Sequence, residues 1–261
     1  MRKRIWVIVL TVLIFLSGTL LGVSATFRVS AVTVEASVVS DEAHEEAKDL
    51  EKQLREAYDK DSTLFVDSKK AEKILERFPY FYMTAFQKSY PRRIVVKVPE
   101  DAEVYALSCS GESEEYYILN ADGEVLGIRN TPENRFDGEA NVFLKGLTVE
   151  VSSDNRTLQG DDRFAPMLAM STEFSRLLGG IRSNVVSAEV YIRNPETIFC
   201  FTMREGVKLY IGSPETATAE KANAAIEKYL SLSDHEKLTG AIVVLDGVDG
   251  LVVTYQSKVP F

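Results

Sequence analysis

The residues of this chain that are best suited to chemistry are few and widely spaced. Two histidines, His44 and His235, and two cysteines, Cys109 and Cys200, occur in 261 residues. Each histidine falls in or beside a predicted helix among acidic residues, where an exposed side chain is expected rather than a catalytic base. The sequence contains no GxSxG, HExxH or Walker motif and no cysteine with a matched histidine. It therefore predicts no catalytic residue.

Carboxylates and metal ligands lead to the same expectation. Asp161 and Asp162 are neighbours in a predicted loop, whereas acid–base catalysis needs two side chains that converge on a substrate. The cysteines show neither CxxC nor His-rich spacing, so no metal site is predicted. An exported body would allow Cys109 and Cys200 to pair, but two buried free thiols in strands are the more ordinary outcome. We expect no cofactor, no small-molecule substrate and no enzyme activity.

The distribution of charge excludes one class of partner. The net charge is −9, but residues 1–26 carry three basic and no acidic side chains. The rest of the chain therefore has 27 basic and 39 acidic side chains, a balance of −12. Such a body repels a phosphate backbone and an anionic lipid surface. We expect no nucleic-acid partner.

An apolar segment near the N-terminus predicts a membrane anchor. Ile5–Val23 is nineteen residues without a charge, close to the ~20 that a helix needs to cross the hydrocarbon core. Arg2, Lys3 and Arg4 precede it, so the positive-inside rule leaves the N-terminus in the cytoplasm and exports the body. A cleaved signal peptide is the alternative, but its apolar region is usually only ~7 to 15 residues. The sequence thus predicts a single-pass protein of the cytoplasmic membrane.

The stretch from Asp67 to Val98 predicts one half of a small α+β domain. Apolar residues at helical spacing predict a short helix that Pro79 ends. A period of two then predicts two strands, Tyr80–Phe86 and Ile94–Val98, with a turn at Pro91 between them. This unit cannot bury its own apolar face, so other parts of the chain must complete it.

Residues 27–58 are expected to supply the missing elements. Phe27–Val38 alternates as a strand, and Ser40 can cap a helix that runs to Tyr58. The predicted order over residues 27–99 is strand, helix, helix, strand, strand, with the helices on one face of a three-stranded sheet.

From residue 100 the chain predicts a second domain made of short strands. The final strand lies at the end of the chain and is a natural candidate for a sheet edge. The predicted strands of this domain are 104–107, 115–119, 124–128, 142–147, 185–193, 197–203, 207–211, 241–245 and 251–255, and its two predicted helices are 164–178 and one that starts at Thr216 or Thr218.

In this order, the residues resemble the bacterial cell-division family called FtsQ or DivIB. The 67–98 stretch is similar to the second half of a POTRA domain, and later segments are similar to the family's β domain. Ala36 replaces a usual glycine, Asn120 replaces a usual aspartate, and the stretch 99–103 lacks a common arginine and proline. The matching positions in the first part are Phe27, Val29, Val32, Val34, Leu64, Phe65, Pro79, Phe81, Phe86, Pro91, Ile94, Val96 and Val98. Those in the second part are Tyr117–Leu119, Asp122, Gly123, Gly206–Gly212, Lys221 and Ala241–Asp246.

The resemblance implies the fold class and the domains. The class is α+β, with a single N-terminal transmembrane helix, a small POTRA domain of order β-α-α-β-β and a mainly antiparallel β domain with two helices. Residues 1–26 are then a short cytoplasmic tail and anchor, 27–99 the POTRA domain, 100–258 the β domain and 259–261 a C-terminal tail.

The resemblance also implies a function. It is that of a non-enzymatic scaffold of the divisome at the division septum, which supports septal peptidoglycan synthesis. The implied partners are small single-pass division proteins of the FtsL and FtsB or DivIC type. Two alternatives remain: a POTRA-containing protein of envelope secretion or assembly, although the chain shows no repeated POTRA unit or barrel pattern, and a cell-wall enzyme.

The family's partner binds near the last strand of the β domain. An edge strand offers free N–H and C=O groups, so we expect binding by strand addition, with Tyr255 as the aromatic anchor. The reading that Leu251 and Val253 only complete the core stays open. The residues predicted to bind a partner are Leu251, Val252, Val253, Thr254 and Tyr255.

Overall fold

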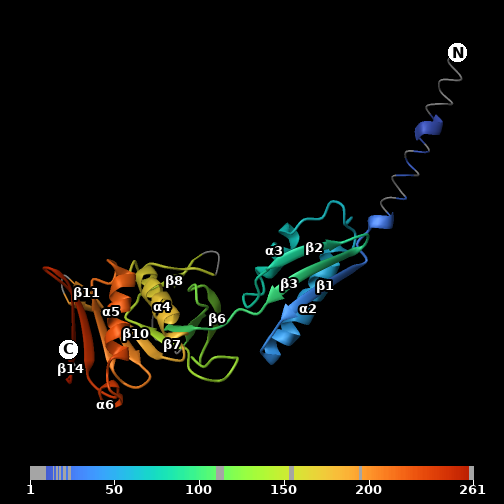
Figure 1. The fold of residues 1–261 in the computed structure, drawn as a ribbon. Helices are drawn as coiled ribbons and strands as arrows, with labels where there is room; N and C mark the ends of the chain where they lie inside the picture. Colours follow the sequence, from blue (N-terminus) through green and yellow to red (C-terminus); the bar gives the residue numbers. More distant parts are fainter. Residues whose placement is uncertain are drawn as a thin grey trace. The chain divides into compact units, whose positions relative to one another are not determined.

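The computed structural model describes residues 10–258, apart from 14, 16, 18, 20, 21, 23, 24, 110–114, 153–155 and 194–195. The chain divides into two compact units, Met1–Asp101 and Ala102–Phe261 (Figure 1). The division between the units falls after Asp101, two residues later than the boundary predicted after residue 99. Each unit has its own hydrophobic core.

The predicted transmembrane helix requires a correction. Within the described part of the chain, the helices are all too short or too polar to cross a membrane. A spanning helix needs ~20 consecutive apolar residues. The predicted fold class, which includes this helix, is therefore wrong on that point, and the chain is described as α+β. The predicted anchor Ile5–Val23 lies largely outside the described residues.

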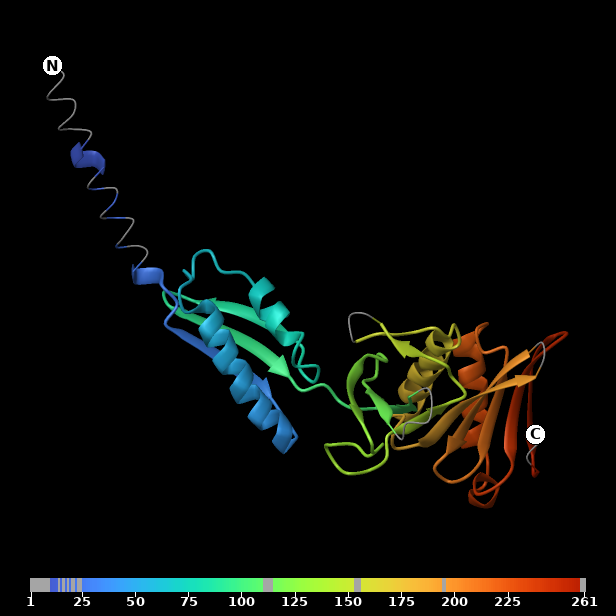
Figure 2. The same cartoon turned by 180° about the vertical axis from the view of Figure 1, so that it is seen from behind.

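The first unit is a three-stranded sheet with two helices on one face (Figure 2). The strand order is β1-β3-β2, with β1 parallel and β2 antiparallel to β3. Ile94, Val96 and Val98 of β3 are buried against the helices, whereas Glu35 and Lys97 form an ion pair at 3.3 Å on the other face. The elements are β1 Ala31–Ser37, α2 Asp41–Tyr58, α3 Lys69–Leu75, β2 Ala85–Ser89 and β3 Arg93–Pro99.

Local sequence explains the start of α2 but not the start of β2. The Ser40 hydroxyl accepts a hydrogen bond from the Ala43 N–H, as an N-cap should. The predicted strand from Tyr80 begins only at Ala85, because the Phe81 N–H donates to the Phe78 carbonyl in a turn. Tyr80 and Phe81 are both buried, so alternation does not describe this aromatic run.

The second unit is built on a nine-stranded sheet of order β14-β13-β12-β11-β10-β7-β4-β5-β6. Three strand pairs are parallel, β4 with β7, β7 with β10, and β12 with β13, so the sheet is mixed. The elements are β4 Tyr105–Ser108, β5 Tyr116–Leu119, β6 Val125–Arg129, β7 Val142–Lys145, β8 Glu150–Val151, β9 Leu158–Gln159, α4 Phe164–Leu178, β10 Val185–Arg193, β11 Glu196–Met203, β12 Lys208–Gly212, α5 Thr218–Leu230, α6 Asp234–Lys237, β13 Ala241–Gly247 and β14 Gly250–Gln256.

This unit has one more helix than the two that the sequence analysis predicts. The additional helix, α6, is four residues long and begins with a capping box. The Ser233 N–H and hydroxyl both donate to the Glu236 carboxylate. The Ser-x-x-Glu spacing is readable in the sequence and is the signal that would have found this helix.

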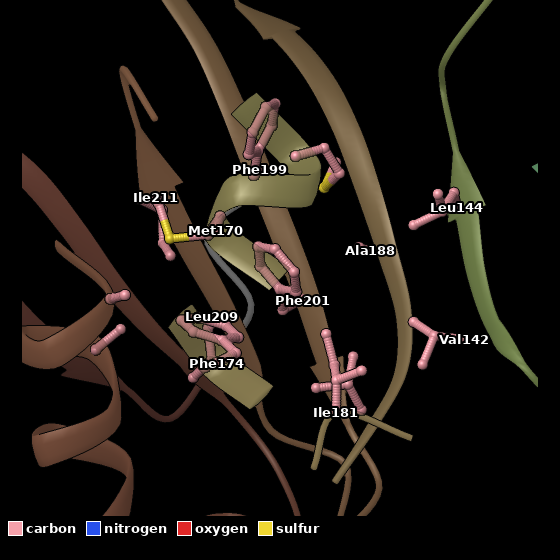
Figure 3. Packing of buried hydrophobic residues seen from close by; sticks show 14 of the residues in the cluster. Val142, Leu144, Met170, Phe174, Ile181, Ala188, Phe199, Phe201, Leu209 and Ile211 are labelled. Atoms are coloured by element: carbon pink, nitrogen blue, oxygen red, sulfur yellow. The ribbon is translucent and has the colours of Figure 1, made fainter. Parts of the chain in front are cut away.

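The helices α4 and α5 pack on one face of the sheet. Figure 3 shows Met170 and Phe174 in one cluster with Phe199 and Phe201, and the ring centroids of Phe174 and Phe201 lie 4.5 Å apart. The opposite face carries a smaller cluster to which the helices contribute no residue. The buried members of this cluster are Ile198, Cys200, Tyr210, Ala241 and Val243.

Both cysteines are free thiols. Cys200 is buried in the helix-free face of the sheet, and burial raises its pKa to about 11. Cys109 is partly exposed, and partial burial again raises its pKa. At neutral pH both groups are therefore thiols rather than reactive thiolates.

A buried carboxylate before α4 predicts a pH-dependent stability. Asp161 accepts hydrogen bonds from the Arg163 side chain, the Arg163 N–H and the Thr148 N–H, and its side chain is 5% exposed. The hydrogen bonds from the Arg163 guanidinium lower the pKa of Asp161 to about 2. Because the folded pKa is below the unfolded one, Asp161 stabilises the fold above about pH 4, by about 2 kcal/mol.

This contribution should be lost as the pH falls from about 4 to about 2. We expect Asp161→Asn to lower the free energy of urea unfolding at pH 7 and the difference from wild type to shrink across that window. Asp162→Asn, a change at the exposed neighbour, is the matched control. If the difference in unfolding free energy between Asp161→Asn and wild type stayed constant down to pH 2, the lowered pKa of Asp161 would not be the source of this stability.

Candidate protein-binding edge

The five residues predicted to bind a partner lie together on β14, the strand at one end of the nine-stranded sheet (Figure 1). This strand pairs antiparallel with β13, with Val253 opposite Val244 and Tyr255 opposite Ile242. In the part of the chain that the structure describes, no strand pairs with its outer side. The predicted edge position is therefore observed.

The two faces of β14 differ. Leu251, Val253 and Tyr255 are half-buried and pack against the main core, on the face that α5 covers. Val252 is 49% exposed, and Thr254 is also exposed on the opposite face. Leu251 and Val253 thus pack against the core, as the alternative interpretation expected. The side chains that remain accessible to a partner are those of Val252 and Thr254.

Tyr255 already has contacts within the chain. Its hydroxyl donates to the Thr239 carbonyl at 3.2 Å and approaches the Glu236 carbonyl at 3.4 Å. Gly240 allows this approach, because a Cβ there would lie 2.4 Å from the Gln256 carbonyl oxygen and its φ is +83°. The ring thus fixes the end of β14 against the loop after α6. Its predicted contact with a partner remains a prediction.

The edge of β14 lacks the features that usually protect a sheet edge. Its sequence, GLVVTYQ, contains neither a charge nor a proline. The other strands at the ends of the two larger sheets each carry a charge: Glu35 on β1, Lys88 on β2 and Arg129 on β6. The β6 edge is also partly covered, since the Val125 N–H donates to the Arg156 carbonyl at 2.7 Å. Of these four edges, β14 is the one suited to accept another strand.

A buried lysine positions this edge. The Nζ atom of Lys221, on α5, donates to the Gly212 and Ser213 carbonyls, the Thr216 hydroxyl and the Asp246 carboxylate, at 2.8 to 3.0 Å. The Lys221 side chain is fully buried, whereas that of Asp246 is 53% exposed. Removing an ammonium group from water costs several kcal/mol, which these four acceptors offset.

The lysine joins two segments next to the edge. One is the loop between β12 and α5, where Ser213 and Ala217 have φ values of 44° and 49°, in the left-handed region that residues with a Cβ rarely adopt. The other is the end of β13, where Asp246 is the register partner of Leu251. In the sequence, Lys221 is singled out only by the family resemblance, because the burial of a lysine side chain cannot be recognised from the residues around it in the chain.

Other polar groups of the described chain lie in a cleft of this unit or at the surface. A cleft of about 500 Å³ is lined by Tyr105, Asp137, Thr172 and Arg182, among others. The hydrogen bond from Arg182 lowers the pKa of Asp137, so this carboxylate is ionised at neutral pH and is not a proton donor. Both histidines are exposed. In the described ranges, no three histidine, cysteine or acidic side chains are grouped to hold a metal.

No family model matches the chain, and no curated protein matches it. The similarity to the FtsQ or DivIB family therefore rests on the residues quoted above.

Replacing Lys221 tests its positioning role. We expect Lys221→Met to lower the free energy of unfolding by about 2 to 4 kcal/mol, because buried carbonyls of the β12–α5 loop lose their donor. Asp246→Asn should cost at most about 1 kcal/mol, since a half-exposed carboxylate is well solvated.

Lys228→Met is the matched control on the same helix. Urea unfolding followed by circular dichroism measures all three variants. Wild-type stability for Lys221→Met would show that its four contacts do not position the loop.

Proposed function

We propose that the chain is a non-enzymatic scaffold of the bacterial division apparatus. In this proposal β14 accepts a strand from a small single-pass division protein of the FtsL and FtsB or DivIC type. The protein then acts at the division septum and supports septum formation and septal peptidoglycan synthesis.

The observation that carries the proposal is the unprotected edge of β14. In an antiparallel strand roughly half of the residues direct their N–H and C=O groups away from the neighbouring strand. On β14 these outward groups meet no other strand of the described chain. An added strand would replace water as their partner, with a net gain of about 0.5 to 1.5 kcal/mol for each hydrogen bond.

Side chains add specificity to this backbone pairing. An added strand would place alternate residues beside Val252 and Thr254 on the helix-free face and beside Leu251 and Val253 on the helix-covered face. Val252 is the most exposed apolar side chain of the five. It is therefore the position at which a partner side chain would bury the most new apolar surface.

The type of partner is supported by the resemblance and by the order of the elements. The first unit has the order strand, helix, helix, strand, strand that the resemblance implies for a POTRA domain. In the second unit, Lys221 and residues Ala241–Asp246 of β13 are part of the resemblance and position β14.

Charged substitutions on β14 test the proposal. We expect Val252→Lys and Thr254→Lys each to weaken capture of a co-expressed partner pair of the FtsL and FtsB or DivIC type by about tenfold, because an edge lysine opposes strand addition. Both side chains are exposed, so the fold should be retained.

Ile128→Lys is the matched control. Ile128 is 53% exposed on β6, at the opposite end of the same sheet, and its substitution should leave capture unchanged. Unchanged capture by the two β14 variants, with wild-type circular dichroism, would exclude strand addition at this edge. A fluorescent fusion that forms no mid-cell band would contradict the wider proposal.

A further inference from the structure

One end of the first unit exposes aromatic side chains to solvent. Phe65, in the loop between α2 and α3, is 86% exposed, and Tyr90, at the corner between β2 and β3, is 58% exposed. Leu64 is 37% exposed beside them. We call residues 60–65 and 88–93 together the aromatic tip. Large apolar side chains that gather on a surface usually mark an interaction site.

The two segments of the aromatic tip form one surface. The Thr63 hydroxyl donates to the Pro91 carbonyl at 2.5 Å, and the Lys88 ammonium reaches the Leu64 carbonyl at 3.5 Å. Thr63 also donates its N–H to the Phe27 carbonyl, and the ring of Phe27 meets that of Tyr90 edge to face at 6.2 Å. These contacts hold Phe65 and Tyr90 on the same end of the unit.

The aromatic tip is basic, in contrast to the chain as a whole. It contains Lys60, Lys88, Arg92 and Arg93 and one acidic residue, Asp61. The Asp61 carboxylate is paired with Lys70, and the adjacent Asp59 is paired with Arg28. The net charge of −9 therefore hides a locally positive surface. Screening limits the reach of distant charges to about 10 Å, so this local charge decides what the tip binds.

The aromatic tip also joins the apolar N-terminal residues. The Arg92 guanidinium donates to the carbonyls of Ala25 and Thr26, which lie in a helical stretch, residues 25–27, that precedes β1. Upstream, the side chains of Leu10 and Phe15 are 60% and 73% exposed.

We propose that the aromatic tip lies in the headgroup layer of an anionic lipid bilayer. Phe65 and Tyr90 insert among the headgroups, where amphipathic and aromatic rings are favoured. Lys60, Lys88 and Arg93 bind lipid phosphates around them. The net charge predicts that the body as a whole avoids anionic lipid; the proposal makes the aromatic tip an exception, because its four basic side chains outnumber its one acidic side chain. This contact is interfacial, is made by folded residues and is independent of β14.

The test uses the full chain with one reporter indole. Trp6 is the only tryptophan, so Phe65→Trp is made in a Trp6→Phe background. Tyr82→Trp is the matched control, since Tyr82 is 48% exposed in the same unit but follows α3, before β2. Each variant is mixed with vesicles of phosphatidylglycerol and phosphatidylcholine, some of whose chains carry bromine near the headgroup.

We expect the fluorescence emission of Trp at position 65 to shift to shorter wavelength and to be quenched by the bromines near the headgroup. The emission of Trp at position 82 should stay as it is in buffer. Adding Lys60→Gln, Lys88→Gln and Arg93→Gln should weaken the quenching at position 65, by about fivefold in lipid affinity for each charge removed. Phosphatidylcholine alone should quench less than the anionic mixture.

Three results would overturn the proposal. They are a chain that does not bind the vesicles, a bound chain whose indole at position 65 is not quenched, and equal quenching at positions 65 and 82. An emission at position 65 that responds to added division proteins but not to vesicles would assign the aromatic tip to a protein partner instead. None of these results changes capture at β14, so the two proposals fail separately.

Discussion

The need to pair backbone polar groups governs the second unit. The inner strands of the nine-stranded sheet pair their N–H and C=O groups with a neighbour on each side, whereas β14 and β6 have a neighbouring strand on one side only. The sheet is open, so it has two edges. β14 differs from the edge strands β1, β2 and β6 because its sequence has no charged residue that would oppose pairing with another strand.

The helices and the buried lysine make this edge a fixed surface. One face of β14 packs against the core that α4 and α5 complete, and the strand pairs in continuous register with β13. At one end Lys221 links Asp246 to the strained loop after β12, and at the other Tyr255 is held against the loop after α6. An ordered edge loses little conformational entropy when a strand is added, which is an advantage for binding.

The first unit shows why net charge alone misleads. The chain is acidic overall, yet the aromatic tip combines Phe65 and Tyr90 with four basic side chains, and Asp61 and the adjacent Asp59 form ion pairs. The two units therefore present different chemistries: exposed backbone with small side chains at β14, and aromatic rings with positive charge at the aromatic tip. A chain with two such surfaces is suited to link partners of different kinds.

The sequence by itself determined the local elements. Periodicity and capping predicted the order of the first unit, the Ser40 cap and the alternation of β14, because these depend on neighbours within a few residues. Only tertiary structure decided the rest. Tyr80 and Phe81 lie in a buried turn after Pro79, the sheet is mixed, Lys221 is buried, and Phe65 is exposed while Phe81 is buried. Each of these depends on contacts between residues far apart in the chain, which spacing along the sequence does not encode.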